Sequence, residues 1–425
     1  MSLALLLIVI FLLFVLRVPM AFAILGPSIA YLVLEDYSLG LAVRLVMGGI
    51  NSWPLLAVPL FILVGIVATR TEIADRLYDA AVLLLGPLRA GLAYVNIGVS
   101  LGFSWMSGAA LADAAGLGSI EVNHMRKKGY PAEFSVGLSA SSALISPIMP
   151  PSIPAVVYAS VAAVSTGALF AAAILPAILV TAALVVTVYI WARRRPDLVG
   201  DPYDWTAVRR AVIRALPPLG APVLILGGIL GGFFTPTEAA GIGALYMLLL
   251  AFSYRTVTVR QLGVIFRDTG SITAQIMLII GASSLLSWIL AREQVPQAVA
   301  EGLLGITSDP LIFLLIINVV LVFLGMILEP TSALLIVTPI LLPVAVQFGI
   351  DPLQFGSLLI FNLMIGLLTP PMGGVAFVLS SVTGIPVERV FKGALFYMPA
   401  LLLVLAIVTY VPAVTLWLPS VLGLS

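Results

Sequence analysis

The sequence predicts an all-α polytopic membrane protein, built as an inverted repeat with two oppositely oriented helical hairpins and two broken helices. Hydrophobic residues make up 61% of the 425-residue chain and charged residues only 9%, against about 25% charged in a typical soluble protein. The apolar residues fall in long runs in every quarter of the chain, and a double proline recurs in both halves. Such a chain cannot cover a surface in water, which excludes a soluble enzyme and a nucleic-acid-binding protein.

The residue types also limit the chemistry. Twenty Lys and Arg residues balance 19 Asp and Glu, so no general attraction to polyanions such as nucleic acid is expected. The chain has no cysteine and a single histidine, His124, which excludes disulfides, thiolate metal sites and a polyhistidine centre. It also lacks a Gly-x-x-x-x-Gly-Lys loop. We therefore expect no enzymatic activity and no ATP hydrolysis, so that energy coupling has to come from an ion gradient.

The apolar runs are predicted to be helices, because a membrane β-barrel would show short alternating strands. No basic residue precedes the first run, so we expect a retained helix and not a signal peptide. Several runs are too short to span a bilayer of ~30 Å, and the pairs flanking Ser107-Gly108 and Glu329-Pro330 are predicted to be helical hairpins. The runs cover residues 3–16, 20–34, 54–69, 91–106, 109–121, 132–164, 168–192, 219–233, 237–253, 270–290, 310–328, 331–347, 353–383 and 394–418.

Basic residues predict the orientation, since short cytoplasmic loops collect Lys and Arg. Basic clusters at 126–128, 193–214, 255–267 and 389–392 place the opening of the first hairpin in the cytoplasm and that of the second hairpin outside. The stretch from 197 to 215 is the only sizeable polar linker, and it lies near the middle of the chain.

A double proline relates the two halves. Pro150-Pro151 and Pro370-Pro371 are separated by 370 minus 150, or 220 residues, and each pair lies within a long apolar run. Two halves of like order and opposite membrane direction are typical of secondary transporters, whose broken helices hold substrate and ion at mid-membrane. Each proline removes a backbone donor and interrupts the helix, which frees carbonyl oxygens that can hold a small hard cation. The alternative is that these prolines only shape packing.

Five segments in a fixed order carry a family resemblance. They are 17–23 (RVPMAFA), 107–114 (SGAALADA), 234–240 (FTPTEAA), 325–329 (GMILE) and 366–371 (GLLTPP). In this order and spacing the chain resembles, from end to end, the large membrane subunit of tripartite ATP-independent periplasmic (TRAP) transporters, the family typified by dicarboxylate and sialic acid systems.

The resemblance implies an elevator mechanism, in which hairpins and broken helices carry Na⁺ and substrate across while the other helices stay as a scaffold. It implies uptake of a small organic acid: a dicarboxylate, a sialic acid or another sugar acid. Na⁺ would be the coupling ion, with no cofactor, and the protein would lie in the inner or cell membrane of a bacterium or archaeon. The implied partners are a periplasmic substrate-binding protein and a small four-helix membrane subunit, expected as a separate chain because this one starts at the large subunit's first helix.

The expected division of the chain follows the two repeats. Residues 1–90 and 219–308 are predicted scaffold and arm helices, 91–165 and 309–384 are the two transport elements, 166–218 holds a connecting helix and the cytoplasmic linker, and 385–425 holds the C-terminal helix.

The resemblance also implies site residues. The first sodium site would use Ser104, Ser107, Ser146, Met149 and Pro151, and the second Gly325, Leu328, Gly366, Thr369 and Met372, mostly through main-chain carbonyls. The substrate would contact Gly108, Ala109, Asp113, Glu329, Pro330, Thr331 and Gly373. Ala109-Ala110 stands where many relatives carry hydroxylated residues, so no side-chain oxygen is expected there.

Several residues have a structural interpretation as well. Ser107 is equally a helix cap, and Asp113 either favours a helix N-terminus or lies near a cation. Glu329 either pairs with the scaffold, shapes the sodium site or contacts solute. Glu238 follows Thr235-Pro236 in the pattern of a capping box. At the level of function, the alternative is a stand-alone symporter of organic anion and sodium in the same superfamily, which needs no binding protein.

Overall fold

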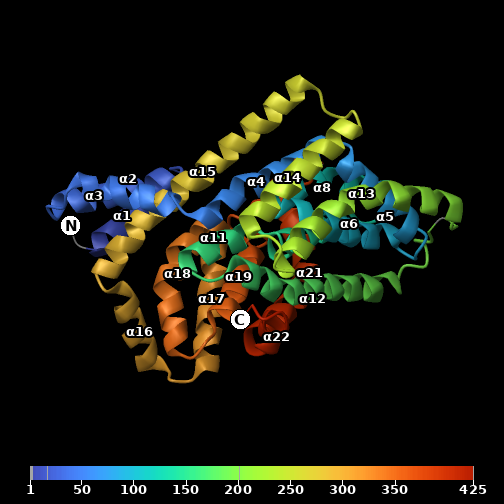
Figure 1. Ribbon diagram of the computed structural model, residues 1–425. Coiled ribbons are helices and arrows are strands. Elements are labelled where there is room, and N and C mark those ends of the chain that lie inside the picture. Colours follow the sequence, from blue (N-terminus) through green and yellow to red (C-terminus); the bar gives the residue numbers. More distant parts are fainter. Residues whose placement is uncertain (1–2, 17, 201, 425) are drawn as a thin grey trace.

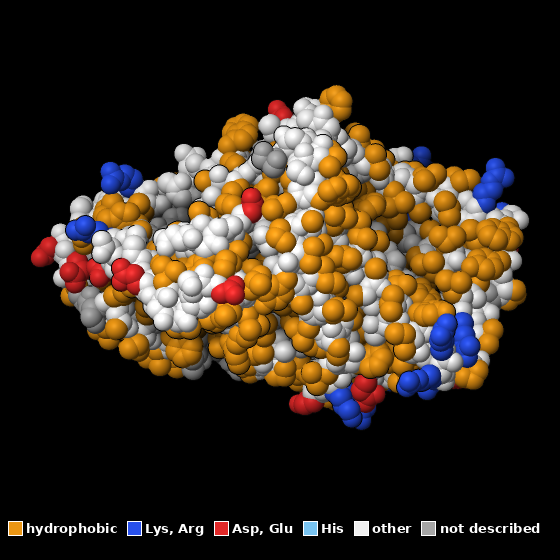
Figure 2. Space-filling model, turned by 90° about the horizontal axis from the view of Figure 1, so that it is seen from below, with side chains coloured by type: hydrophobic (Ala, Val, Ile, Leu, Met, Phe, Trp, Pro, Cys, Tyr) orange, Lys and Arg blue, Asp and Glu red, His pale blue; other side chains and the backbone are white. Residues whose placement is uncertain are grey.

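The computed structural model describes residues 3–16, 18–200 and 202–424, and every regular element in these ranges is a helix. Eight of the helices are long and apolar enough to cross a membrane, or up to nine if a bent pair counts as one span. Hydrophobic side chains fill the middle of the face seen in Figure 2, and Lys and Arg lie around its margin. The predicted all-α polytopic membrane fold is confirmed.

The first half contains the helices predicted as scaffold, a hairpin, a broken helix and a long connecting helix (Figure 1). The scaffold helices are α1 (Leu3–Val15), α2 (Met20–Leu34), α3 (Leu39–Ile50), the short 3₁₀ helix η1 (Trp53–Leu56), α4 (Ala57–Arg70) and α5 (Ile73–Leu85). The hairpin consists of α6 (Gly91–Ser107), α7 (Ala110–Gly116) and α8 (Gly118–Lys127). The broken helix consists of α9 (Ala132–Ser142), α10 (Ile145–Ile148) and α11 (Ile153–Ala162), and α12 (Thr166–Ala192) follows.

The second half repeats this order. Its scaffold helices are α13 (Trp205–Leu230), α14 (Pro236–Ser253), α15 (Val259–Arg292) and α16 (Val295–Ile306). The second hairpin consists of α17 (Pro310–Ile327) and α18 (Pro330–Gln347), and the second broken helix of α19 (Pro352–Gly366) and α20 (Gly374–Thr383). The chain ends with α21 (Val387–Tyr410) and α22 (Ala413–Val421).

Each hairpin packs on the broken helix of its own half, and the broken helices also pack across the halves. α6 contacts α9 and α10, and α17 contacts α19, while α11 and α12 contact α19 and α20 contacts α7 and α8. The bend between α9–α10 and α11 is 42°. Long α15 crosses the molecule beside α2, α3, α4 and α18 (Figure 1), so that one scaffold helix reaches from the N-terminal group to the second hairpin.

Acid-proline pairs begin the helices of the second transport element. The side chains of Asp309 and Asp351 accept hydrogen bonds from the amides of Leu311 and Leu353 over 2.8 and 2.7 Å, and a proline occupies the next position in both cases. A proline there loses no helical bond, because the first amides of a helix have no intrahelical partner. The predicted capping box of Thr235 and Glu238 is present at the start of α14.

Three helices lie outside the predicted apolar runs, and the run 394–418 is divided between two helices. α3, α5 and α16 are short and amphipathic or carry charges, and α22 is separated from α21 by Pro412. The expected polar linker is also shorter than predicted, because α13 begins at Trp205, capped by the Asp204 carboxylate through the amides of Thr206 and Ala207. Apolar run length detects long continuous apolar helices, and it misses short amphipathic ones.

Candidate functional site

The tip of the first hairpin rests on the break in the first broken helix. Gly108 follows α6 with a φ of +61°, a conformation that glycine adopts without steric cost. A Cβ at Gly108 would lie 2.7 Å from the carbonyl oxygen of Pro151. The hairpin tip and the break therefore touch main chain to main chain.

The second hairpin meets the second break in the same way. A Cβ at Gly366, the last residue of α19, would lie 2.3 Å from the carbonyl carbon of Gly325 on α17. Beyond the break, the amide of Met372 donates to the carbonyl of Met326 over 3.2 Å. The α17 arm of the hairpin thus contacts the chain on both sides of the break.

Main-chain carbonyls gather at both breaks. Pro150 and Pro370 lack the N–H groups that would bond the carbonyls of Ser146 and Gly366 in a continuous helix, and both Pro-Pro peptide bonds are cis. The Gly366 carbonyl instead accepts from the amide and the hydroxyl of Thr369 over 3.0 and 3.1 Å. The two breaks thus correspond in chain position, and a proline without an N–H occupies the same place in each.

A buried carboxylate lies beside the first break. Asp113 on α7 is 1% exposed and accepts a hydrogen bond from the Ser146 hydroxyl over 2.9 Å, and Ser100 is a further partner. Among the described side chains, no basic group forms an ion pair with Asp113. A buried charge without an opposite charge is costly, so this position favours a cation.

A cavity of about 590 Å³ lies between the two hairpin tips, within the volume range of small-molecule sites. Its lining from the tips and from α15 includes Gly108, Ala109, Glu329, Pro330, Thr331, Ile272, Gln275, Ile276 and Ile279. The described lining residues contain one carboxylate, Glu329, and neither Lys nor Arg. The cavity is therefore mainly apolar and brings together the tips of both repeats.

A sequence model of the tripartite ATP-independent periplasmic transporter, DctM component, matches residues 7–414. The chain belongs to this family of TRAP permeases. The predicted family is thereby confirmed, and the chain is a multi-pass component of a tripartite membrane transporter.

Named relatives cover nearly the whole of this TRAP permease. The sialic acid TRAP transporter large permease protein SiaM of Vibrio cholerae is 41% identical over 404 residues, 95% of each chain. The C4-dicarboxylate TRAP transporter large permease protein DctM of Pseudomonas aeruginosa is 39% identical over 380 residues, 88% of each chain. Among solved structures, the YdaH transporter of Alcanivorax borkumensis is 15% identical with a TM-score of 0.58 over 86% of each chain, a likeness of fold.

The five residues predicted for the first sodium site of the TRAP permease come from two segments in contact. Ser104 and Ser107 lie at the end of α6, and Ser146, Met149 and Pro151 lie at the first break, all of them buried. The hydroxyls of Ser104 and Ser107 donate to the carbonyls of Leu101 and Ala109 over 2.6 and 3.3 Å. Because both hydroxyls act as donors, the lone pairs of the two serine oxygens are not used in these bonds.

The five residues predicted for the second site also come from two contacting segments, the end of α17 and the second break. Gly325 and Gly366 are buried, whereas the Met372 side chain is 54% exposed. Only the main chain of Met372 is therefore directed to the break. The Thr369 hydroxyl donates to the carbonyls of Ile365 and Gly366 over 2.9 and 3.1 Å.

Five of the seven predicted substrate residues line the cavity: Gly108, Ala109, Glu329, Pro330 and Thr331. The other two lie elsewhere, since Asp113 faces Ser146 and Gly373 packs against the ring of Phe391.

The Glu329 carboxylate also caps α18. It accepts from the Ser332 amide over 3.0 Å and from the Thr331 hydroxyl over 2.9 Å. Helix capping was not among its three predicted roles. Glu329 also lies in the cavity wall, and contact with solute stays a prediction.

Sequence reasoning missed the α15 wall of the cavity and a symmetric pair of amide contacts. Ser142 donates to the Oδ1 of Asn96 over 2.9 Å, and Asn362 donates to the Oδ1 of Asn318 over 2.6 Å. Each contact joins the first arm of a hairpin to the first half of its broken helix. The positions correspond between repeats, at offsets of 362 minus 142, or 220, and 318 minus 96, or 222. This spacing was the available signal.

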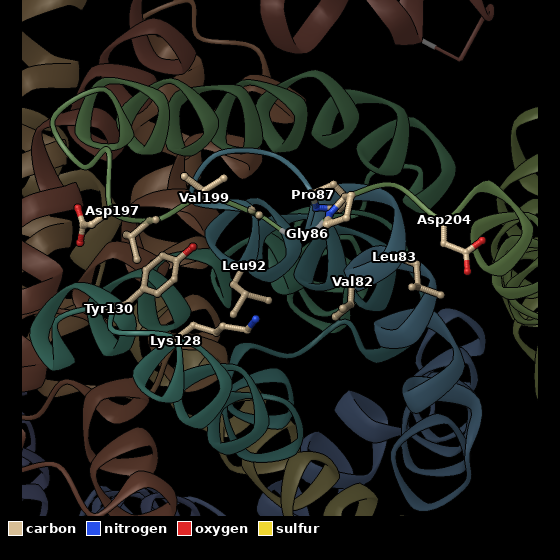
Figure 3. Close-up of a pocket in the computed structure, with 14 residues that line it drawn as sticks. Val82, Leu83, Gly86, Pro87, Leu92, Lys128, Tyr130, Asp197, Val199 and Asp204 are labelled. Atoms are coloured by element: carbon tan, nitrogen blue, oxygen red, sulfur yellow. The ribbon is translucent and has the colours of Figure 1, made fainter.

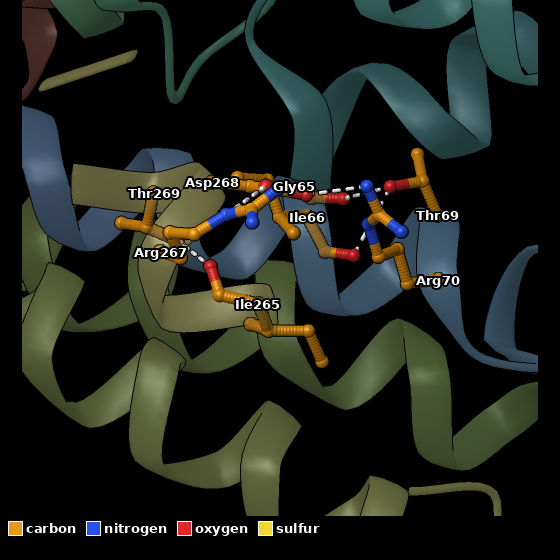
Figure 4. Close-up of polar contacts among 8 residues, drawn as sticks. All are labelled: Gly65, Ile66, Thr69, Arg70, Ile265, Arg267, Asp268 and Thr269. Carbon is orange, nitrogen blue, oxygen red and sulfur yellow. Dashed lines mark hydrogen bonds and ion pairs between the residues drawn. The ribbon is translucent and has the colours of Figure 1, made fainter. Parts of the chain in front are cut away.

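An ion pair between Arg70 and Asp268 joins α4 to α15, with Arg267 3.8 Å from the same carboxylate (Figure 4). α4 also touches the first hairpin tip, because a Cβ at Gly65 would lie 3.3 Å from the carbonyl oxygen of Met106. The pair is partly exposed, so we expect it to contribute at most about 1 kcal/mol. It aligns the scaffold helix that supports the tip with the helix that forms the cavity wall.

A second cavity, of about 330 Å³, lies where the linker after α12 crosses the start of α6. Figure 3 shows Lys128, Tyr130 and linker residues around it, including Asp197 and Asp204. Neither hairpin tip contributes to it, so it is distinct from the candidate transport site.

Proposed function

We propose that this TRAP permease is a sodium-coupled importer of a small organic acid that a periplasmic binding protein delivers. The observation that carries the proposal is the cavity of about 590 Å³ between the two hairpin tips, each of which rests on a broken helix. Substrate and ions would thus occupy one connected region, as coupling requires.

The charge of the cavity supports an accompanying cation. An organic anion that enters a cavity with one carboxylate and no basic residue among its described lining residues is repelled unless positive charge comes with it. Sodium ions at the two breaks would supply that charge. Binding of the anion and of sodium would then favour each other, which is the thermodynamic basis of coupling.

The residues at both breaks fit a hard cation that prefers oxygen ligands. The first site would use carbonyls and hydroxyls of Ser104, Ser107, Ser146, Met149 and Pro151, with the Asp113 carboxylate balancing the charge. The second would use Gly325, Leu328, Gly366, Thr369 and Met372 and has no carboxylate among these residues. Unwound carbonyls are the usual sodium ligands of broken-helix transporters.

The packing supports an elevator mechanism. Each hairpin and its broken helix contact one another and the equivalent element of the other half, so both elements can move as one body. α15 lines the cavity from the scaffold side. The α15 wall consists mostly of aliphatic side chains. The two hairpins and broken helices could therefore move along it without breaking many polar contacts.

The substrate and partners are proposed from the relatives. SiaM is named for sialic acid and DctM for C4-dicarboxylates, so we propose a carboxylate substrate of that size for this chain. A periplasmic binding protein and a small four-helix membrane subunit would complete the transporter in a bacterial or archaeal inner membrane.

Reconstitution into proteoliposomes tests the proposal. The full chain with its small subunit should take up radiolabelled sialic acid or succinate only with an inward sodium gradient and a periplasmic binding protein loaded with that acid. A choline gradient or omission of the binding protein should abolish uptake. Sodium-driven uptake by this chain alone would instead establish the alternative, a stand-alone symporter of organic anion and sodium.

A further inference from the structure

A continuous file of buried polar side chains leads away from the first break. Ser100 and Asn96 of α6 alternate with Ser142 and Ser139 of α9, and all four are at most 2% exposed. The Ser100 and Ser142 hydroxyls are 3.1 Å apart, Ser142 donates to Asn96 over 2.9 Å, and Asn96 donates to Ser139 over 2.6 Å. Ser100 also faces Asp113, so that the file starts at the proposed first sodium site.

The file ends at a second buried carboxylate, Glu121 of α8. Glu121 is 3% exposed, and its Oε2 accepts from the Asn96 amide and, over 3.1 Å, from the Ser139 hydroxyl. Its Oε1 is buried and has no hydrogen-bond partner in the described part of the chain. An orphaned carboxylate oxygen at the end of a polar file indicates a missing ligand.

The groups around Glu121 do not supply a positive charge through any contact that the structure describes. Asp113 adds a like charge. Tyr78 of α5 faces the carboxylate, and its hydroxyl shares a hydrogen bond of 2.6 Å with Nδ1 of His124, one turn further along α8. The hydrogen bonds that Glu121 accepts come from a neutral amide and a neutral hydroxyl. Two nearby buried carboxylates with neutral partners are costly unless a cation accompanies them.

The second repeat lacks this feature. Its equivalent contact joins Asn318 to Asn362, and the polar groups next to it are Thr409 and Gln354. Residues 341 and 342, which are 220 and 221 positions after Glu121, are both leucine. The carboxylate is therefore not needed to hold a hairpin on its broken helix, since the second repeat makes that contact with amides alone.

We propose that Glu121 forms an additional binding site for a monovalent cation, joined to the first sodium site by the file of serines and Asn96. The site rests on the proposed sodium coupling and extends it. The file runs toward the basic end of α8, which the distribution of basic residues assigns to the cytoplasm. It would therefore serve as the place where the coupling ion pauses on its way from the first break to the cytoplasm.

Binding of ²²Na⁺ to the purified full-length chain tests the site, and it needs neither substrate nor binding protein. Glu121→Gln keeps the size and hydrogen-bonding groups of the side chain and removes its charge, so the variant should fold. It should bind one sodium ion fewer per molecule than wild type. In proteoliposomes the sodium concentration for half-maximal uptake should rise about tenfold. Glu133→Gln, which alters a surface carboxylate that pairs with Arg389 on α21, is the matched control and should match wild type.

The other outcomes overturn the site. Equal sodium binding by Glu121→Gln and wild type would show that the residue is structural. Equal sodium binding together with a lost pH dependence of uptake would show that it carries a proton instead. If wild-type protein binds no sodium at all, the proposed sodium coupling itself is refuted. This outcome is distinct from failure of the Glu121 site, because it is measured on the wild-type protein alone.

Discussion

Replacing Gly366 by alanine tests the contact between the second hairpin and the second break. The added Cβ would lie 2.3, 2.5 and 2.5 Å from the carbonyl carbon, Cα and carbonyl oxygen of Gly325. Carbon atoms pack at about 3.5–4.0 Å, so α17 and α19 would have to separate by roughly 1.2 Å or more. All three atoms belong to the main chain, and no side-chain rotation relieves the overlap.

That displacement exceeds the tolerance of a binding site, which is about 0.5 Å. We expect the sodium concentration for half-maximal uptake to rise by about tenfold or more, with overpacking lowering stability by about 1–3 kcal/mol. The assay is uptake in proteoliposomes at varied sodium concentration. Membrane insertion is checked by the amount of protein in the liposomes. Gly102→Ala is the control, because a Cβ there meets no atom within 4 Å. An unchanged sodium response in Gly366→Ala would refute the placement of the second site.

Three further substitutions test the other parts of the site. Ser146→Ala removes a hydrogen bond to Asp113 and should weaken ²²Na⁺ binding several-fold, and unaltered binding would exclude this side chain from the first site. Asn318→Leu leaves the Asn362 amide without the Oδ1 acceptor and should lower the free energy of unfolding by about 1–3 kcal/mol, and a wild-type melting temperature would show that this contact does not stabilise the protein. Gln275→Leu should raise the KM for substrate and leave the sodium dependence at saturating substrate unchanged, because Gln275 lines the cavity from α15, which carries none of the residues predicted for the sodium sites. A shifted sodium dependence at saturating substrate would be the contrary result.

Local sequence features predicted much of the transport elements. The double prolines marked both breaks, because a missing N–H interrupts a helix in any surroundings. Gly108 and the Glu329-Pro330 pair marked the hairpin tips for similar local reasons. The residues of both sodium sites were implied by the family resemblance, and they lie at these two breaks and the hairpin ends next to them. Their binding of sodium stays a prediction.

The residues that local patterns could not assign are those whose role depends on a partner far away in the chain. Gln275 lies on an ordinary amphipathic helix, and nothing in its neighbours shows that its face meets the two hairpin tips. Asp113 was predicted to contact substrate, and the structure places it on Ser146, 33 residues away. Glu121 carried no motif, since its significance comes from Asn96 and Ser139 on two other helices.

The sequence by itself determined that this protein lies in a membrane, that it repeats one architecture in opposite directions and where its helices break. Composition, run length and proline chemistry act on neighbouring residues and hold whatever the rest of the chain does. Only the tertiary structure decided which helix forms the cavity wall, which carboxylate lies beside the first break and which buried oxygen is left without a partner. Those outcomes depend on packing between segments distant in sequence. The role of a buried polar group can be inferred only when its neighbours in space are known.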